Sequence, residues 1–206
     1  MIENNILGVI LAGGKSKRMG KDKHLIKLGE KTLIEYTITK VQKLLKEVII
    51  ISNYKIDLAA QYNIEIVPDK LKEQQGPLVG IFTALDWIKK KNKKYNWIAT
   101  FPCDTPFFPM SLIEKFIDLS INKKSELYFA SSKGQRHNIF GLWSVNLYEN
   151  LKKDILNTNI RKVQDWADRN NVEKIEFNFK DFDPFFNINT IEDLEKAIEL
   201  KKNYND

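Results

Sequence analysis

The stretch Ile6-Leu-Gly-Val-Ile-Leu-Ala-Gly-Gly-Lys-Ser-Lys-Arg-Met-Gly-Lys-Asp-Lys23 organises this chain of 206 residues. Residues 6–12 form a continuous apolar run that is too short for a helix, so they predict a buried β-strand. The strand runs into Gly13 and Gly14, which allow the backbone to approach a ligand closely and to point N–H groups at an anion. Cations follow, including Arg18, whose guanidinium matches phosphate geometry. We interpret the segment as a phosphate loop; the alternative is a glycine-rich turn with solvated lysines.

The spacing of the glycines excludes two familiar phosphate loops. A P-loop reads G-x-x-x-x-G-K-[ST], whereas here five residues separate Gly14 from Gly20, and Lys21 is followed by Asp22. The dinucleotide pattern G-x-G-x-x-G fails because Gly13 and Gly14 are adjacent. The loop is therefore of a third kind.

Composition narrows the class of protein. A hydrophobic share of 43% over this length suits one domain with a sizeable core. No apolar run approaches the ~20 residues of a membrane span, and no signal peptide is visible. Cys103 is the only cysteine, which excludes an internal disulfide and suits a reducing, cytoplasmic location. Because His24 and His137 are the only histidines, we expect any metal to be a hard, oxygen-bound cation.

The net charge of +6 raises the question of nucleic-acid binding. The chain has few arginines, and its lysines are scattered over amphipathic segments. The one dense run, at 89–94, closes a predicted helix, where cations complement the helix dipole. Polyanionic small molecules explain the charge equally well, so we predict neither a nucleic-acid nor a membrane partner.

Strands and helices alternate in the first half of the chain. Apolar runs predict strands at 48–52, 64–67 and 97–101, and one-sided apolar stripes predict helices after the capping box Thr32…Glu35 and from Gly76-Pro77. Continuously apolar strands indicate a parallel sheet with helices on both faces. We therefore predict an α/β fold, a single-domain three-layer α/β/α sandwich with a mostly parallel, Rossmann-like sheet.

The second half is less regular. We expect helices near 110–119, 146–156, 160–169 and 191–200, the last with Thr190 as its N-cap. Strands are expected at 127–130, 139–143 and 172–179, the first two joined by a polar loop over 131–138. Arg136 and His137 would then be surface residues that could reach a second anionic substrate.

Polar residues follow the predicted parallel strands, where ligands bind in such sheets. Asp104, between two prolines, is a turn former or a Mg²⁺ ligand; opposite a phosphate loop we favour Mg²⁺, which pairs one or two carboxylates with substrate phosphates. Asp69 accepts hydrogen bonds from a ribose or base, or caps a turn. Cys103 is interpreted as a small buried filler, since nothing nearby would activate it as a nucleophile.

Asn187 and Asn189 alternate in an extended segment, so their side chains are expected on one side. We interpret them as a second anion or metal-water site, with helix capping as the alternative. The sequence contains no evident Ser-His-Asp arrangement, so the chemistry that fits is phosphoryl or nucleotidyl transfer, which depends on positioning and charge neutralisation. A phosphate acceptor, largely dianionic at neutral pH, needs no protein base.

Four blocks of sequence carry a resemblance to a known family. They are Leu11-Ala-Gly-Gly…Arg18-Met-Gly…Asp22-Lys23, Gly76-Pro-Leu-Val-Gly80, Phe101-Pro-Cys-Asp-Thr-Pro106 and Phe186-Asn-Ile-Asn-Thr-Ile-Glu-Asp-Leu194. Together, and in this order, they resemble the molybdenum cofactor guanylyltransferases (the MobA family). The resemblance implies that GTP reacts with molybdopterin or Mo-molybdopterin to give the guanine dinucleotide cofactor and pyrophosphate. The pterin phosphate would attack the α-phosphorus of GTP in line.

The resemblance also implies a role for each matched residue. The nucleotide is contacted by Leu11, Ala12, Gly13, Gly14, Lys23, Asn53, Asp69, Gly76 and Asp104. Arg18 and Lys23 hold the triphosphate and the departing pyrophosphate, and Asp104 binds Mg²⁺; these three are the expected catalytic residues. The acceptor is contacted by Arg18, Asn187 and Asn189. Residues 1–108 would form the GTP and Mg²⁺ half and 109–206 the acceptor half, with other cofactor-biosynthesis proteins and apo-molybdoenzymes as partners.

Asn138 follows His137 where the family commonly has proline, so we expect the acceptor-side loop to differ in shape. One alternative is a CTP-dependent cytidylyltransferase that acts on the same pterin. Such enzymes tend to have Ala-Ala-Gly where this chain has Ala12-Gly13-Gly14, which favours guanine. The others are a sugar- or alditol-phosphate nucleotidyltransferase and, outside enzymes, a basic nucleic-acid-binding protein.

Overall fold

The computed structural model of the chain describes residues 5–13, 25–71, 76–122, 124–158 and 160–203. Gly14, Arg18 and Lys23, three residues of the predicted phosphate loop, lie outside the described residues.

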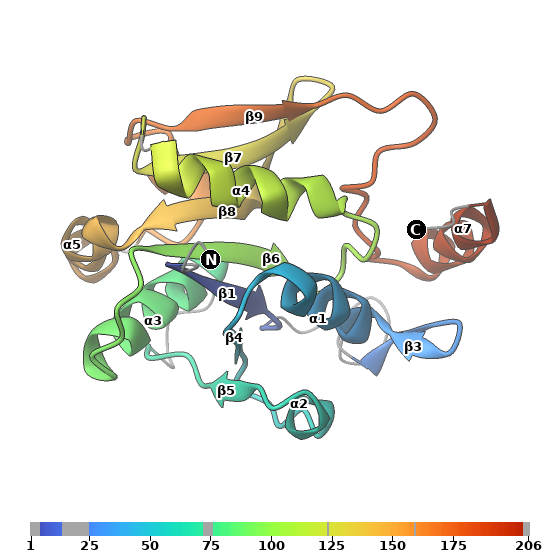
Figure 1. Cartoon of the computed structure of the whole chain (residues 1–206), viewed down its shortest axis with the longest axis horizontal. Helices are drawn as coiled ribbons and strands as arrows, with labels where there is room; N and C mark the ends of the chain where they lie inside the picture. Colours follow the sequence, from blue (N-terminus) through green and yellow to red (C-terminus); the bar gives the residue numbers. More distant parts are fainter. Residues whose placement is uncertain (1–4, 14–24, 72–75, 123, 159, 204–206) are drawn as a thin grey trace.

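A seven-stranded sheet forms the centre of the molecule, in the order β5-β4-β1-β6-β8-β7-β9 (Figure 1). The strands are β1 (Ile6–Leu11), β4 (Val48–Ile51), β5 (Glu65–Val67), β6 (Trp97–Pro102), β7 (Leu127–Ser132), β8 (Gln135–Ser144) and β9 (Glu173–Phe177). The pairs β5–β4, β4–β1, β1–β6 and β7–β9 are parallel. Only β8 runs against its neighbours β6 and β7 in this sheet. The predicted, mostly parallel sheet is confirmed.

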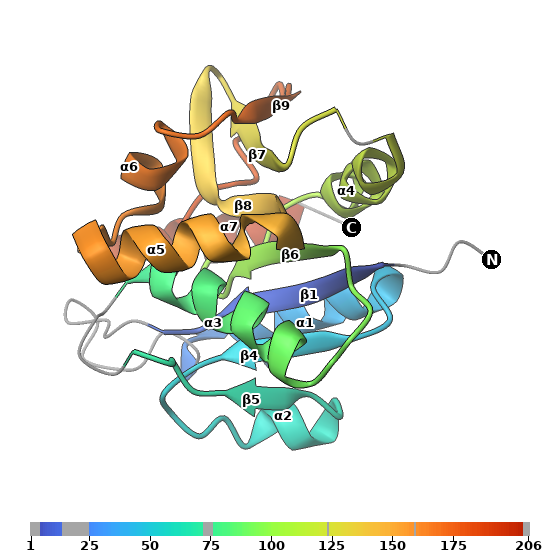
Figure 2. The ribbon, with the colours of Figure 1, turned by 90° about the vertical axis from the view of Figure 1, so that its left-hand side faces the viewer.

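Helices cover both faces of the sheet, as predicted. The first face carries α1 (Leu33–Leu44), α2 (Leu58–Gln61) and α4 (Met110–Asn122). The second face carries α3 (Pro77–Lys90), the 3-10 turn η2 (Val145–Leu147), α5 (Tyr148–Thr158) and α6 (Val163–Ala167) (Figure 2). Ile6 and Ile10 of β1 enter the first core, and Leu7 and Val9 enter the second. A strand covered on both sides must be apolar throughout, which explains the uninterrupted run in the sequence.

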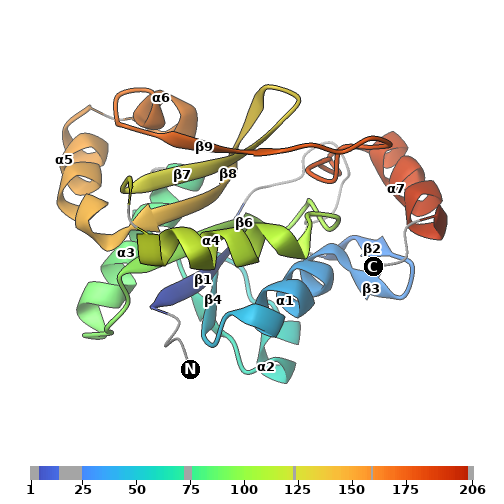
Figure 3. The ribbon, with the colours of Figure 1, turned by 45° about the horizontal axis from the view of Figure 1, so that its top comes forward.

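The C-terminal helix α7 (Ile191–Asn203) lies beside the small hairpin of β2 (Lys27–Leu28) and β3 (Lys31–Thr32), away from the main sheet (Figures 1 and 3). A separate apolar cluster joins them, with Leu28, Ile188 and Ala197 completely buried. The predicted N-cap forms, since Thr190 Oγ1 accepts from the N–H of Asp193 at 3.1 Å. The capping box of α1 forms as well. No helix in the described ranges is long and apolar enough to cross a membrane.

The prediction of a polar loop over 131–138 was wrong. A turn of two residues, Lys133 and Gly134, joins β7 to β8, and residues on either side of it remain paired, such as Ala130 with His137. Both turn residues have positive φ, 50° and 76°, as a tight hairpin requires. Gly134 suits this conformation, but Lys133 gives no signal for it. The segment near 160–169 also contains a shorter helix than predicted, Val163–Ala167.

Candidate active site

The carboxyl ends of four parallel strands are level at one edge of the sheet. Leu11 at the end of β1 pairs with Ile51 of β4 and with Pro102 of β6, while Ile51 pairs with Val67 of β5. Because the register is level, the residues that follow these strands meet at the same edge, where α/β sheets bind their ligands. Asn53, Asp69 and Asp104 therefore lie near Gly13, as the sequence predicts.

A cavity of about 670 Å³ opens at this edge. Its lining includes the predicted residues Leu11, Gly13, Gly76, Asp104 and Asn187. Its opposite wall comes from β8 and from the chain before and within α6. A larger hollow, about 970 Å³, lies where β1 and β4 begin, and no predicted site residue lines it. We place the candidate site in the smaller cavity because the predicted residues converge there.

Asn53 and Asp69 form a hydrogen-bonded pair beside Gly13. Asn53 Nδ2 donates to Asp69 Oδ2 at 3.0 Å, and the main-chain N–H of Asp69 donates to Asn53 Oδ1 at 2.9 Å. Ideal Cβ atoms built on Gly13 and Gly80 would each lie 3.8 Å from one oxygen of the Asp69 carboxylate, so both glycines leave room beside it. Asn53 and Asp69, which follow the neighbouring strands β4 and β5, therefore hold each other in place.

The second carboxylate oxygen of Asp69, Oδ1, is buried and has no hydrogen-bond partner in the described part of the chain. Burial raises the pKa of Asp69, although the hydrogen bond from Asn53 lowers it. A buried acceptor without a donor is unfavourable for the folded protein. Oδ1 lies on the side of the carboxylate that faces Gly80 of α3, so the fold holds Asp69 in this position at a cost in free energy.

The main-chain groups of β1 are partly used within the fold. The N–H of Ala12 donates to the carbonyl of Ile51 at 3.0 Å. Leu11 packs under Gly80, whose ideal Cβ would lie 3.0 Å from Leu11 Cδ2. Leu11 therefore lines the cavity, whereas Ala12 packs in the first core and its N–H is bonded within the sheet.

Asp104 at the end of β6 is tied to the distant segment that precedes α7. Its main-chain carbonyl accepts from the N–H of Ile188 at 2.9 Å. Thr105 Oγ1 lies 3.4 Å from Asp104 Oδ1 and also donates to Asn187 Oδ1. The structure thus brings Asp104 and Asn187 together. Asn189 does not line the cavity, and its main-chain N–H donates to Asp193 at the start of α7.

The oxygens around Asp104 suit a magnesium ion. The Asp104 side chain lines the cavity and supplies a carboxylate, and the Asn187 amide oxygen lies on the other side of Thr105. Among the described residues, no three His, Cys, Asp or Glu side chains are grouped closely enough to hold a metal. One carboxylate and one amide oxygen fit Mg²⁺, which usually takes one or two protein carboxylates together with substrate phosphates and water.

Arg136 lies in β8, and the expectation of a surface loop here was wrong. The Arg136 side chain is only 14% exposed and lines the cavity wall. Its Nη2 pairs with Asp168 at 2.6 Å, and its Nε donates to Asn138 Oδ1 at 2.6 Å. Asn138 therefore supplies a side-chain acceptor that orients Arg136.

His137 also lines the cavity, on the same wall. Its Nε2 lies 2.7 Å from Ser132 Oγ, which donates to Asp183 Oδ2 at 2.5 Å, and its ring stacks on Phe185. Because Ser132 gives its proton to Asp183, the network assigns the His137 proton to Nε2. Burial lowers the pKa of His137, while Asp183 and Glu176 raise it in part. The ring is therefore mostly neutral at pH 7.

Arg161 and Lys162 line the cavity just before α6, and the sequence did not single them out. Both are solvent-exposed, and they add positive charge on the side opposite Asp69. Their position depends on a long-range contact, since an ideal Cβ on Gly76 would lie 3.1 Å from the Arg161 carbonyl oxygen. No local pattern in the sequence indicates that contact.

Replacing Gly76 tests this contact. Gly76 has φ 139° and ψ 159°, a region that is essentially limited to glycine. We expect Gly76→Ala to cost about 1–3 kcal/mol of unfolding free energy in urea. It should also weaken binding of an anionic acceptor, because the new methyl group displaces the Arg161 backbone.

Gly134→Ala is the matched control, since Gly134 also has positive φ but its added Cβ would meet nothing within 4 Å. We expect a loss of stability in this variant without a loss of acceptor binding. Acceptor binding that is unchanged in Gly76→Ala would contradict the role of the contact.

A family model and several relatives of known name match this chain over most of its length. The model of the MobA-like NTP transferase domain matches residues 8–172. A molybdenum cofactor guanylyltransferase of Haemophilus influenzae is 35% identical over 194 residues, which cover 94% of this chain and 97% of that protein. One of Rhizobium johnstonii is 34% identical over 200 residues, which cover 95% and 92%.

Solved structures share the fold. Molybdopterin-guanine dinucleotide biosynthesis protein A of Archaeoglobus fulgidus has a TM-score of 0.76 at 22% identity, covering 96% of this chain and 100% of that one. A 4-diphosphocytidyl-2C-methyl-D-erythritol synthase of Anaerococcus prevotii has a TM-score of 0.73 at 16% identity, covering 96% of both.

Proposed function

The chain belongs to the MobA-like NTP transferases, and we propose that it is a molybdenum cofactor guanylyltransferase, which transfers GMP from GTP to the phosphate of molybdopterin and releases pyrophosphate. The observation that carries the proposal is the level edge of the sheet: Gly13 and Asp104 follow parallel strands and line one cavity, and the Asp69 carboxylate lies beside Gly13. Relatives named as this enzyme align over nearly the whole chain.

The nucleotide side of the cavity is formed by residues from about 1–108. Asn53 fixes Asp69, and the Asp69 carboxylate beside Gly13 accepts from an N–H of the guanine or a hydroxyl of the ribose. Gly13 and Gly76 allow the nucleotide to approach the backbone. The expected contacts of Gly14, Arg18 and Lys23 with the triphosphate remain predictions.

The acceptor side is formed by residues from about 109–206. Arg161, Lys162 and Asn187 line it, together with His137 of β8. Arg136 is paired with Asp168, and Arg161 and Lys162 add further positive charge for an anionic acceptor. A guanidinium suits the two-point binding of a phosphate. A phosphorylated pterin with polar ring edges fits this mixture of cations, an amide and a neutral imidazole.

The reaction needs no protein base. The pterin phosphate is largely dianionic at neutral pH and attacks the α-phosphorus of GTP directly, while the bond to the pyrophosphate oxygen breaks. Asp104 would hold Mg²⁺, which when bound neutralises charge on the triphosphate. Thr105 and Asn187 keep the Asp104 carboxylate beside the acceptor. The protein thus contributes orientation and charge, as this reaction class requires.

We infer a cytoplasmic reaction, because the lone Cys103 is buried and suits a reducing compartment. The product would then pass to other cofactor-biosynthesis proteins and to apo-molybdoenzymes. The direct experiment mixes the protein with GTP, Mg²⁺ and molybdopterin and measures pyrophosphate. CTP replaces GTP in a parallel reaction, and turnover with CTP alone would favour the cytidylyltransferase alternative.

Thermal unfolding gives an independent test of nucleotide choice. GTP with Mg²⁺ at about 100 times its Kd should stabilise the protein by about 2.7 kcal/mol, which corresponds to a rise in Tm of about 5–10 °C. If Asp69 accepts from the base, we expect a much smaller rise with CTP at the same concentration, because guanine presents two adjacent N–H donors, at N1 and N2, and cytosine presents only its amino group. Equal shifts with both nucleotides would argue against guanine selection.

A further inference from the structure

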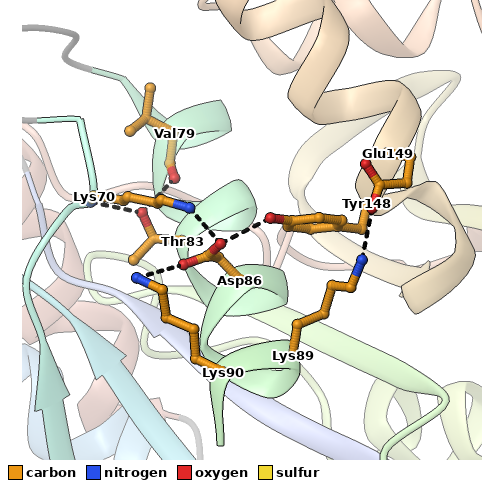
Figure 4. A network of polar contacts seen from close by, with 8 residues as sticks. All are labelled: Lys70, Val79, Thr83, Asp86, Lys89, Lys90, Tyr148 and Glu149. Carbon is orange, nitrogen blue, oxygen red and sulfur yellow. Dashed lines mark hydrogen bonds and ion pairs between the residues drawn. The ribbon is translucent and has the colours of Figure 1, made fainter. Parts of the chain in front are cut away.

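Lys70, the residue after Asp69, is anchored at both ends to α3 (Figure 4). Its main-chain N–H donates to Thr83 Oγ1 at 3.0 Å, and Thr83 Oγ1 donates in turn to the Val79 carbonyl at 2.8 Å. Its ammonium group donates to Asp86 Oδ1. The chain that leaves β5 is therefore fixed to α3 immediately after Asp69.

Asp86 is the centre of this network. The residue is 5% exposed, and it accepts from Tyr148 OH at 2.8 Å and from Lys90 Nζ at 3.1 Å, besides Lys70. Burial raises the pKa of Asp86, but the bonds from Lys70, Tyr148 and Lys90 outweigh it, and the pKa falls below its usual value. Asp86 is therefore charged at neutral pH, and it joins the Asp69 segment to α3 and to the start of α5.

The two lysines on Asp86 have different positions. Lys90 lies on the same helix as Asp86, four residues further along, and its side chain is 68% exposed. Lys70 is 32% exposed, lies over the Phe82 ring at 5.1 Å, and is covalently next to Asp69. Both lysines therefore neutralise the charge of Asp86, but only the bond from Lys70 also links Asp86 to the main chain next to Asp69.

We propose that Lys70 and Asp86 are positioning residues for the nucleotide: they fix the main chain that carries Asp69, so that the Asp69 carboxylate stays beside Gly13, where it accepts from the donor groups of GTP. Asn53 holds Asp69 from one side, and the Lys70–Asp86 contact holds it from the other. Neither Lys70 nor Asp86 contacts the nucleotide. This inference rests on the proposed function.

The test compares Lys70→Met with Lys90→Met. Each substitution removes one ammonium group that is bonded to the Asp86 carboxylate. We expect Lys70→Met to raise the KM for GTP about 10-fold and to leave kcat within about 2-fold, because it loosens ground-state binding only. Lys70→Arg should restore the KM, and Lys90→Met should leave it unchanged. If Lys70→Met does not fold, Thr83→Val removes the main-chain anchor instead and should raise the same KM.

A double-mutant cycle with Asp69→Ala separates positioning from general loosening. If Lys70 acts through Asp69, then Lys70→Met adds nothing to the KM of Asp69→Ala, whereas independent effects would multiply. A multiplied effect, or a wild-type KM in Lys70→Met, overturns the inference and leaves the proposed function standing. Absence of GTP-dependent turnover in the wild-type protein would instead reject the proposed function and the inference with it.

Discussion

Asp104→Asn is expected to lower the rate of guanylyl transfer by about 10³-fold or more, since a metal at a phosphoryl centre contributes several kcal/mol and each ~1.4 kcal/mol is tenfold in rate. Asparagine has the same shape, and the bond from Ile188 goes to the main chain of Asp104, so the variant should fold. Pyrophosphate release at saturating Mg²⁺ measures the rate, and thermal unfolding checks the fold.

Asp168→Asn provides the control for Asp104. It removes the same charge near the cavity, where Asp168 pairs with Arg136, but it lies away from the end of β6. We expect kcat within a few-fold of wild type. An Asp104→Asn protein with near-normal turnover would show that another group holds the metal.

Arg161→Ala is expected to raise the KM for molybdopterin by about 10- to 100-fold, because a hydrogen bond to a charged group is worth ~1.5–3 kcal/mol. The KM for GTP should stay within about 2-fold, since the proposed function assigns Arg161 to the acceptor. Steady-state kinetics with each substrate varied in turn measures both values.

Arg169→Ala is the matched variant for Arg161. It removes another exposed arginine from the chain after α6, and that residue does not line the cavity. Its KM for molybdopterin should equal that of wild type. The same rise in KM in both variants would indicate a general effect of charge. A rise in the KM for GTP alone would contradict the assignment of Arg161 to molybdopterin.

Local patterns predicted the first half of the fold well. The apolar runs that form β1, β4 and β6 are buried on both faces. Such strands are apolar at every position, so they can be recognised in the sequence. The rule that ligands bind at carboxyl ends of parallel strands then brought Asp69 and Asp104 to one edge. Capping residues such as Thr32 and Thr190 acted through neighbours three residues away, which sequence also reveals.

The acceptor wall could not be predicted because it depends on long-range pairing. β8 inserts between β6 and β7, and this insertion makes Arg136 and His137 cavity residues. Beside His137, Ser132 donates a hydrogen bond to Asp183, which lies 51 positions further along the chain. The contact of Gly76 with Arg161 is similar. Periodicity carries no information about such contacts.

The unpaired oxygen of Asp69 has a consequence for attempts to engineer this enzyme. A neutral side chain at position 69 would remove a charge whose burial is unfavourable, so a search that ranks variants by heat resistance alone would favour it. The same replacement would remove the carboxylate that the proposed function assigns to the nucleotide. Position 69 should therefore be held constant in any library built for robustness, because the cost to the resting protein and the proposed nucleotide contact come from one carboxylate.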